Sequence, residues 1–356
     1  MRLGTCIALE LAVAAGAVTG VWFGVGHAAS LAGDYLVAPD AQAATRPTRL
    51  PGAHLRIEHP VVVPRPTVFG ASDEELLAPL GEGPVVGIKL NRGGTSLSLR
   101  LDFANGTRAA FKPQQIHPQS DPRREIAAYR IDRLLGIGRV PPAKPVAIPL
   151  TALIDAAEPR HRTYVTSRLE DAIVRGGIVY GELSWWVPEI KLAKLESHAL
   201  DEREGKQLWA SYLKVGATIP AAARPMVEQV ATLLVFDVLI DNADRWSGAN
   251  TVMSPDGAIL YFMDNTLSFS HFKFGHETPN AALRRIEVFP RALIARLRGL
   301  TADVLTRVLD MGEDTRLGPL LDERELTAVL ARRDNILVHV DRMIAEYGEE
   351  AVLALP

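Results

Sequence analysis

The chain has 356 residues, of which 47% are hydrophobic and 23% are charged, so its composition is globular and excludes a disordered or fibrous protein. Its 39 basic and 42 acidic residues give a net charge of -3, which offers no electrostatic attraction for nucleic acid or for an anionic membrane surface. We therefore expect no nucleic-acid partner. The single cysteine, Cys6, excludes an intramolecular disulfide and a zinc site built from cysteines.

Residues 1–33 differ in kind from the rest of the chain. Arg2 precedes an apolar run over residues 3–31 that contains one acidic residue, Glu10, and no lysine or arginine. Such a run is typical of a membrane-targeting segment, either a cleaved signal peptide or an uncleaved anchor, and its length favours the anchor. Positive charge before the run and Asp34 after it predict that the N-terminus stays in the cytoplasm. We expect a membrane-anchored or secreted protein whose body lies outside the cytoplasm.

Residues 34–84 are rich in proline, with alanine, arginine and valine between the prolines. This composition predicts an extended linker between the N-terminal segment and the globular body.

Three antiparallel strands are expected at the start of the globular body. The first covers residues 85–90, and the second, within residues 95–103, alternates leucine with polar residues, as a strand with one buried face does. Asn105-Gly106 is a strong two-residue turn signal, so a third strand is expected over residues 107–112.

Lys112 ends the third strand, and a helix is expected soon after it. The pair Asp121-Pro122 suits an N-cap and a first-turn proline, which predicts a helix as far as Leu135 with Glu125 in its first turns. A strand lysine followed by a helical glutamate is the arrangement with which protein kinases hold nucleotide phosphates. Each residue also has a simpler interpretation, because a strand-end lysine is often a solvated charge and a glutamate stabilises a helix N-terminus.

Gly93 and Gly94 lie between the first two strands, where a kinase loop covers the phosphates. The GxGxxG pattern is absent. The two glycines are therefore interpreted equally as a nucleotide-binding loop or as an ordinary hairpin turn.

A further strand over residues 162–168 is expected to complete a small sheet lobe, with residues 169–171 as the connection to a helical lobe. Trp185 and Trp186 follow this connection, and either pack in the core or contact substrate or lipid.

A helix within residues 225–240 is apolar on most sides, as a central buried helix is. Further helices are expected over residues 203–215, 293–309 with a break near Gly299, and 322–347.

The most informative segment follows the central helix. A polar loop contains Asp244 and Asn250, and a short strand pair then delivers Asp264 at the end of its second strand. Phosphoryl transfer needs a carboxylate near the attacking hydroxyl and oxygen ligands for Mg²⁺ or Mn²⁺. Asp244 fits the first role, and Asn250 with Asp264 fits the second. Aspartate and asparagine are also common in turns, so each residue is weak evidence when taken alone.

In combination, these segments resemble the four-jointed and Golgi casein kinase family of secretory-pathway kinases, which are distant relatives of HipA kinases and phosphatidylinositol kinases. The resemblance covers residues 85–269 in the family's order and is carried by Phe111-Lys112-Pro113, residues 124–136, residues 236–245 and residues 260–265. This sequence departs from the family at Trp246, where a histidine commonly follows the Asp-Arg pair, and at Asn250, six residues after Asp244 rather than five.

The resemblance implies an α+β, two-lobed protein-kinase-like fold with a small antiparallel sheet lobe and a larger helical lobe. We place the N-terminal nucleotide-binding lobe at residues 85–171 and the C-terminal catalytic lobe at residues 172–356. The family implies that Asp244 is catalytic, that Asp264 binds metal and that Lys112, supported by Glu125, contacts phosphate.

The predicted function is an atypical kinase that transfers the γ-phosphoryl group of ATP, with Mg²⁺ or Mn²⁺, to a Ser or Thr hydroxyl of a protein. The alternatives are a lipid or glycan kinase of the same fold, or a non-catalytic pseudokinase that acts as a binding module. The retained set of Lys112, Glu125, Asp244, Asn250 and Asp264 favours an active enzyme, because a non-catalytic descendant has no chemical reason to keep it. Expected partners are ATP, a hydroxyl acceptor, and the membrane through the N-terminal segment.

Overall fold

The computed structural model describes residues 67–91, 96–117, 120–310 and 315–356. The expected membrane-targeting segment, residues 1–33, and the pair Gly93 and Gly94 lie outside the described residues. Within the described ranges, no helix has both the length and the apolar character that crossing a membrane requires.

The last part of the expected linker is folded. Helix α2 (Asp73–Leu77) begins with a capping box, in which the Ser72 hydroxyl accepts from the Glu75 amide and the Glu75 carboxylate accepts from the Ser72 amide. Leu76 and Leu80 are buried, and Leu80 joins the core of the small lobe. The prediction of an extended linker up to residue 84 is therefore wrong for this part, because the prolines lie outside the helix and do not interrupt it.

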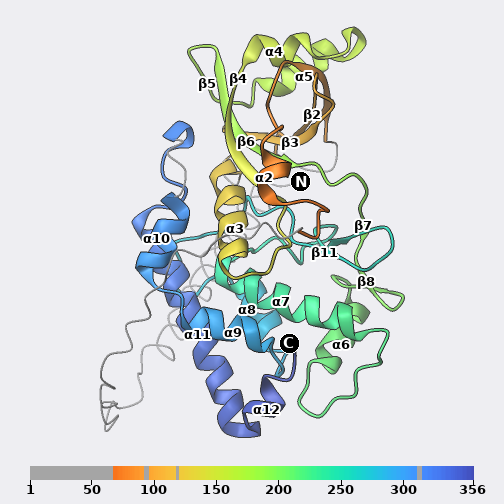
Figure 1. The fold of residues 1–356 in the computed structure, drawn as a ribbon, viewed down its shortest axis with the longest axis vertical. Coiled ribbons are helices and arrows are strands. Elements are labelled where there is room, and N and C mark those ends of the chain that lie inside the picture. The colour runs from red at the N-terminus through yellow and green to blue at the C-terminus, as the bar shows by residue number, and fades with distance from the viewer. Residues whose placement is uncertain (1–66, 92–95, 118–119, 311–314) are drawn as a thin grey trace, which may run out of the picture. The chain divides into compact units, whose positions relative to one another are not determined.

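An antiparallel sheet forms the small lobe, in the order β1-β2-β3-β6-β4, with β5 paired to β6 (Figure 1). Its strands are β1 (Val85–Leu90), β2 (Leu99–Phe103), β3 (Arg108–Pro113), β4 (Ala143–Pro149), β5 (Val174–Arg175) and β6 (Ile178–Trp185). The three strands expected before residue 113 are thus confirmed. One face buries Leu99, Leu101 and Phe111 against helices α4 (Leu150–Asp155) and α5 (Arg162–Leu169), which follow β4 and flank the short helix η1 (Pro159–His161).

The expected strand over residues 162–168 is wrong, since this segment is helix α5. Its buried residues, Val165 and Leu169, are four positions apart, which is helical spacing. The strand that completes the sheet is instead β6, which lies beyond the connection expected at residues 169–171. Because β6 pairs with both β3 and β4, the sheet extends past the boundary placed at residue 171, and the chain leaves it only after Trp185.

Helix α3 (Pro122–Leu134) lies between the two lobes, close to its predicted bounds. The Asp121 carboxylate accepts from the Arg123 amide at the N-cap, and Gly136, with φ of +61°, follows the C-terminus. Ala127 and Ile131 of α3 belong to the core of the large lobe. This anchorage fixes the position of Glu125 on the same helix.

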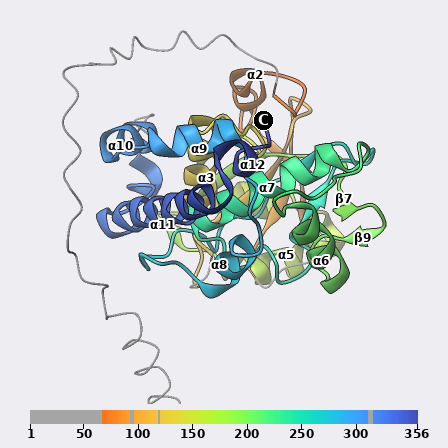
Figure 2. The same cartoon turned by 90° about the horizontal axis from the view of Figure 1, so that it is seen from below.

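The large lobe is mainly helical, as expected. Central helix α7 (Arg224–Ile240) is buried along most of its length, and α11 (Glu323–Tyr347) packs along it after a capping box formed by Asp322 and Glu325 (Figure 2). The helix expected over residues 293–309 is broken at Gly299 into α9 (Arg291–Arg298) and α10 (Ala302–Asp310). The remaining helices are α6 (Arg203–Tyr212), α8 (Glu277–Leu283), η2 (Thr315–Leu317) and α12 (Glu349–Val352).

Two small sheets complete the large lobe. Strands β7 (Lys191–Leu192), β10 (Val252–Met253) and β11 (Leu260–Tyr261) form one, and β8 (Lys194–Leu195) with β9 (His198–Ala199) forms the other. The β10–β11 pair is the short strand pair expected before Asp264. It carries the chain from Asn250 to Asp264.

Candidate active site

Lys112 lies at the end of β3, and its ammonium group binds carboxylates from both lobes. The Nζ atom is 2.6 Å from Oε1 of Glu125 on α3 and 2.8 Å from Oδ1 of Asp264, which follows β11. Only 12% of the Lys112 side chain is exposed. The interpretation of Lys112 as a solvated strand-end charge is therefore wrong.

The charges around Lys112 do not balance. Burial by itself disfavours the charged ammonium, but Asp264, Glu125 and Glu182 together outweigh it and hold the pKa of Lys112 above its ordinary value. The nearby ammonium in turn lowers the pKa of Asp264, against the effect of burial. One ammonium group thus neutralises only part of the negative charge of the surrounding carboxylates, and the site can accept additional positive charge.

Glu182 was not predicted from the sequence, although it lies on β6 directly opposite Lys112. The residue is completely buried, and the Ser184 hydroxyl donates to its Oε2 at 2.7 Å. Burial and the neighbouring Glu125 raise the pKa of Glu182 to about 8, with Lys112 acting in the opposite direction. Burial therefore favours the protonated form of Glu182.

The polar loop begins where α7 ends. Asp241 adopts a left-handed conformation, with φ of +58°, and turns the chain out of the helix toward Asp244. The Asn250 amide donates to Oδ2 of Asp244 at 2.7 Å, and the Ser247 hydroxyl donates to Oδ1 at 2.5 Å. The structure thus brings Asp244 and Asn250 together despite the six-residue spacing.

Arg245 connects this loop to Asp264. Its guanidinium is completely buried, lies 3.2 Å from Oδ1 of Asp237, and donates to the Asn265 side chain and to the Met263 carbonyl. Asn242 adds a bond from its amide to the Asp264 carbonyl at 3.1 Å. The loop with Asp244 and the turn with Asp264 are therefore fixed relative to each other by hydrogen bonds.

The residues fit a divalent cation that shares its ligands with phosphates and water. Asp264 has a left-handed backbone, with φ of +59°, and about half of its side chain (52%) is exposed even though Lys112 binds one of its oxygens. Its other oxygen, with the amide oxygen of Asn250, would provide the hard ligands that Mg²⁺ and Mn²⁺ prefer. Across residues 67–91, 96–117, 120–310 and 315–356, no three His, Cys, Asp or Glu side chains are grouped closely enough to hold a metal by themselves.

Several polar residues of this site carry no distinctive spacing in the sequence. Asn265 and Arg245 lie within the segments that resembled the kinase family, and the preference of Asn for turns was the only local signal. His276 also escaped prediction: its Nδ1 lies 2.8 Å from the buried Asp241 carboxylate at the end of α7.

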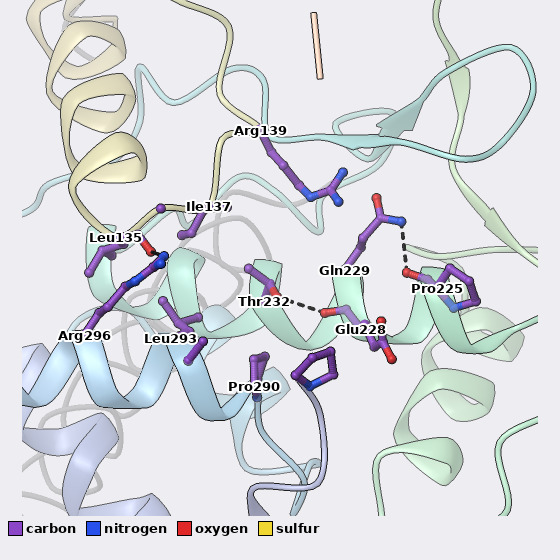
Figure 3. A pocket seen from close by; sticks show the side chains of 13 residues that line it. Leu135, Ile137, Arg139, Pro225, Glu228, Gln229, Thr232, Pro290, Leu293 and Arg296 are labelled. Atoms are coloured by element: carbon purple, nitrogen blue, oxygen red, sulfur yellow. Dashed lines mark hydrogen bonds between the residues drawn. The ribbon is translucent and has the colours of Figure 1, made fainter. Parts of the chain in front are cut away.

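A pocket of about 310 Å³ lies elsewhere, between the loop after α3 and helices α7 and α9 (Figure 3). Arg296 of α9 donates there to the Leu135 carbonyl, and Thr232 of α7 donates to the Glu228 carbonyl at 2.9 Å. Lys112, Asp244 and Asp264 do not line this pocket.

The chain is similar in sequence to kinases and to a pseudokinase. The chain is 26% identical to human glycosaminoglycan xylosylkinase over 296 residues, which cover 73% of this chain and 72% of that protein. It is 24% identical to the human extracellular serine/threonine protein kinase FAM20C, over 79% of this chain and 56% of the relative. The mouse pseudokinase FAM20A is 25% identical, over 73% of this chain and 56% of the relative. No protein-family model matches the chain.

The chain also shares its fold with solved structures of related names. The Golgi casein kinase with Mn/ADP bound has a TM-score of 0.60 and 18% identity, over 79% of this chain and 78% of the other. Hydra Fam20 with sugar has a TM-score of 0.61 and 19% identity, over 79% and 92%. The chain is a relative of the secretory-pathway kinases. The family resemblance, the two-lobed α+β kinase fold and the assignment to the kinases, all predicted from the sequence, are confirmed.

Proposed function

We propose that this secretory-kinase relative is an active enzyme that transfers the γ-phosphoryl group of ATP to a Ser or Thr hydroxyl of a protein. The observation that carries the proposal is the single Lys112 ammonium shared by Glu125 and Asp264, which Arg245 and Asn242 connect to the loop of Asp244. The expectation of ATP with a divalent metal is confirmed by the similar kinase structure that holds manganese and ADP.

In the proposed reaction, Lys112 binds phosphate oxygens, and Glu125 and Asp264 hold its ammonium in place. Asp244 orients the acceptor hydroxyl and accepts its proton while the hydroxyl oxygen bonds to the γ-phosphorus and the bond from that phosphorus to ADP breaks. A metal held by Asp264 and Asn250 would supply positive charge next to the phosphates. The unbalanced carboxylates around Lys112 support this role.

A glycan hydroxyl is the second candidate acceptor. The alignment with the xylosylkinase spans 72% of that relative, whereas the alignment with FAM20C spans 56% of its relative. The FAM20A relative is a pseudokinase, but retention here of Lys112, Glu125, Asp244 and Asp264 in one connected network supports catalysis rather than binding alone.

The proposal includes a location outside the cytoplasm, with the membrane contacted through residues 1–33. Its support is the apolar N-terminal run in the sequence and the secretory-pathway relatives, one of which is named as extracellular. Protease treatment of intact spheroplasts tests this topology, because protease added outside should digest a kinase body that lies on the side of the membrane opposite the cytoplasm.

The experiment that tests the function uses the full chain with labelled ATP and Mg²⁺ or Mn²⁺. Acidic Ser-containing proteins, xylose-containing glycans and phosphoinositides serve as separate acceptors, and Asp244→Asn is the control. Transfer to protein by the wild type alone would support the proposal. Transfer to the glycan alone would favour the second candidate, and nucleotide binding without transfer to any acceptor would favour a pseudokinase.

A further inference from the structure

The face of the small-lobe sheet that carries Lys112 also carries a row of smaller side chains and two arginines, Arg100 and Arg108. In the strand pairing, Lys112 lies opposite Glu182, and Ala110 lies opposite both Ser184 on β6 and Arg100 on β2. Directly opposed residues of an antiparallel pair point to the same face. We call this surface, formed by Arg100, Ala110, Lys112, Glu182 and Ser184, the lysine face.

Arg100 is held on the lysine face by an anion and an aromatic ring. Its Nη2 is 2.8 Å from Oδ2 of Asp102, and its guanidinium carbon lies 5.6 Å from the centre of the Trp186 ring. Only 19% of the side chain is exposed, and the buried Nε–H has no hydrogen-bond acceptor among the described residues. The guanidinium is thus held in one orientation by Asp102 and Trp186, and its planar face is the part of the group that can stack on a ring.

The position of the phosphates determines where the rest of a nucleotide can lie. If Lys112 binds the phosphates, the rest of the nucleotide can extend along the lysine face in only one direction. Strand β3 ends at Pro113, one residue beyond Lys112, and Tyr180 further along β6 packs against the cluster of Ile126, Ala143 and Leu317. In the other direction the next row contains Ala110 and Arg100, beside the point at which the chain leaves the sheet.

The row next to Lys112 contains short side chains at its centre, with Ala110 between Arg100 of β2 and Ser184 of β6, and Lys89 of β1 beyond Arg100. Ala110 and Ser184 are among the shortest side chains of the lysine face, and Arg100 and Trp186 border them. Guanidinium groups stack on aromatic faces, and every nucleobase presents such a face.

We propose that Arg100, oriented by Asp102 and Trp186, is the platform on which the nucleobase of the bound nucleotide stacks. This inference rests on the proposed function, because it requires that the phosphates bind at Lys112. Stacking uses the face of the base rather than its hydrogen-bonding edge, so Arg100 should contribute affinity for the base of ATP. The phosphates should bind at Lys112 whether or not Arg100 is present.

The test separates the base end of the ligand from its phosphate end. Titration calorimetry of the full chain in Mn²⁺ compares ADP with inorganic tripolyphosphate, which lacks a base. Arg100→Leu should bind ADP about five- to thirtyfold more weakly than the wild type and should bind tripolyphosphate equally well. The matched control is Arg108→Leu, because Arg108 contacts the same Asp102 at 3.4 Å, without a ring contact to Trp186, and is more than half exposed. This control should bind both ligands as the wild type does.

A second variant keeps the charge and guards against misfolding. Arg100→Lys retains a cation beside Asp102 but lacks the planar fork, so it should weaken ADP binding and leave tripolyphosphate binding unchanged. ADP affinity equal to that of the wild type in Arg100→Lys, or in a folded Arg100→Leu, would overturn the nucleobase platform alone. A wild-type chain that binds neither ligand would overturn the kinase proposal and this inference with it.

Discussion

Asn265 binds Glu125 with both its backbone and its side chain, across 140 residues of sequence. The Asn265 amide donates to Oε1 of Glu125 at 2.9 Å, and the Asn265 side chain donates to Oε2 at 3.1 Å. Lys112 binds the same Oε1. Helix α3 is therefore tied to the turn after β11, and the lysine that is proposed to hold phosphate lies in a preformed, largely buried network.

This burial changes what is expected of a Lys112 variant. Lys112→Met removes the cation shared by Glu125 and Asp264, so the free energy of unfolding should fall by about 3 kcal/mol, because the buried Glu125 carboxylate is left without its cation. Binding of manganese and tripolyphosphate should also weaken. Urea denaturation and calorimetry measure the two effects, with Lys112→Arg as the variant that keeps the charge. An unaltered unfolding midpoint with normal ligand affinity would restore the interpretation of Lys112 as a surface charge.

The two aspartates should differ in what they control. Asp264→Asn removes the proposed metal ligand and should lose the gain in ATP affinity that Mn²⁺ provides, together with activity. Asp244→Asn should still bind Mn²⁺ and ATP but should transfer phosphate on the order of 10²- to 10⁴-fold more slowly, which is the usual contribution of a positioned acid or base. Calorimetry and single-turnover kinetics separate the two. Full transfer by Asp244→Asn would require a different catalytic residue.

Both carboxylate oxygens of Asp244 already accept hydrogen bonds within the loop. The Ser247 hydroxyl donates to Oδ1 at 2.5 Å and Asn250 donates to Oδ2, so we expect an incoming acceptor hydroxyl to compete with Ser247 for Asp244. Ser247→Ala should lower the KM for the acceptor about two- to tenfold, the scale of one net hydrogen bond, without changing ATP affinity. Asn250→Ala is the contrasting variant, since it should weaken metal-dependent nucleotide binding. A raised acceptor KM in Ser247→Ala would mean that Ser247 helps to position Asp244.

Glu182 should make the stability depend on pH. Its pKa is raised from 4.5 to about 8 in the folded protein, so between these values the folded state holds a proton that the unfolded state has released. The free energy of unfolding should therefore fall as pH rises through this window, by up to about 1.4 kcal/mol per pH unit.

Glu182→Gln is neutral in both states and should remove this contribution. Denaturation curves of both proteins from pH 5 to pH 8 measure the difference in slope. The comparison with the variant is needed because burial also raises the pKa of Asp237, to about 7, which acts in the same direction in both proteins. Parallel curves would mean that Glu182 is ionised in the folded protein at neutral pH.

Local signals in the sequence were sufficient for much of the fold and for the principal candidate residues. The strands before residue 113 follow from alternation and a turn signal, and helix α3 follows from its N-cap and proline. Lys112, Glu125, Asp244 and Asp264 were singled out because each lies at the end of such an element or in its first turns. These features depend on residues within one or two turns of each other, so the sequence alone carries them.

Only the tertiary structure decided the partners of these residues. Segment 162–168 is rich in strand-favouring Thr, Tyr and Val but becomes α5, and β6 is the strand that pairs with β3. Glu182 and Asn265 join the site through contacts with Lys112 and Glu125 that span 70 or more positions, and no spacing in a single sequence encodes such contacts. Whether a lysine is a solvated charge or a phosphate ligand depends on which carboxylates fold against it, and that is fixed by the packing of α3 and the β11 turn around β3.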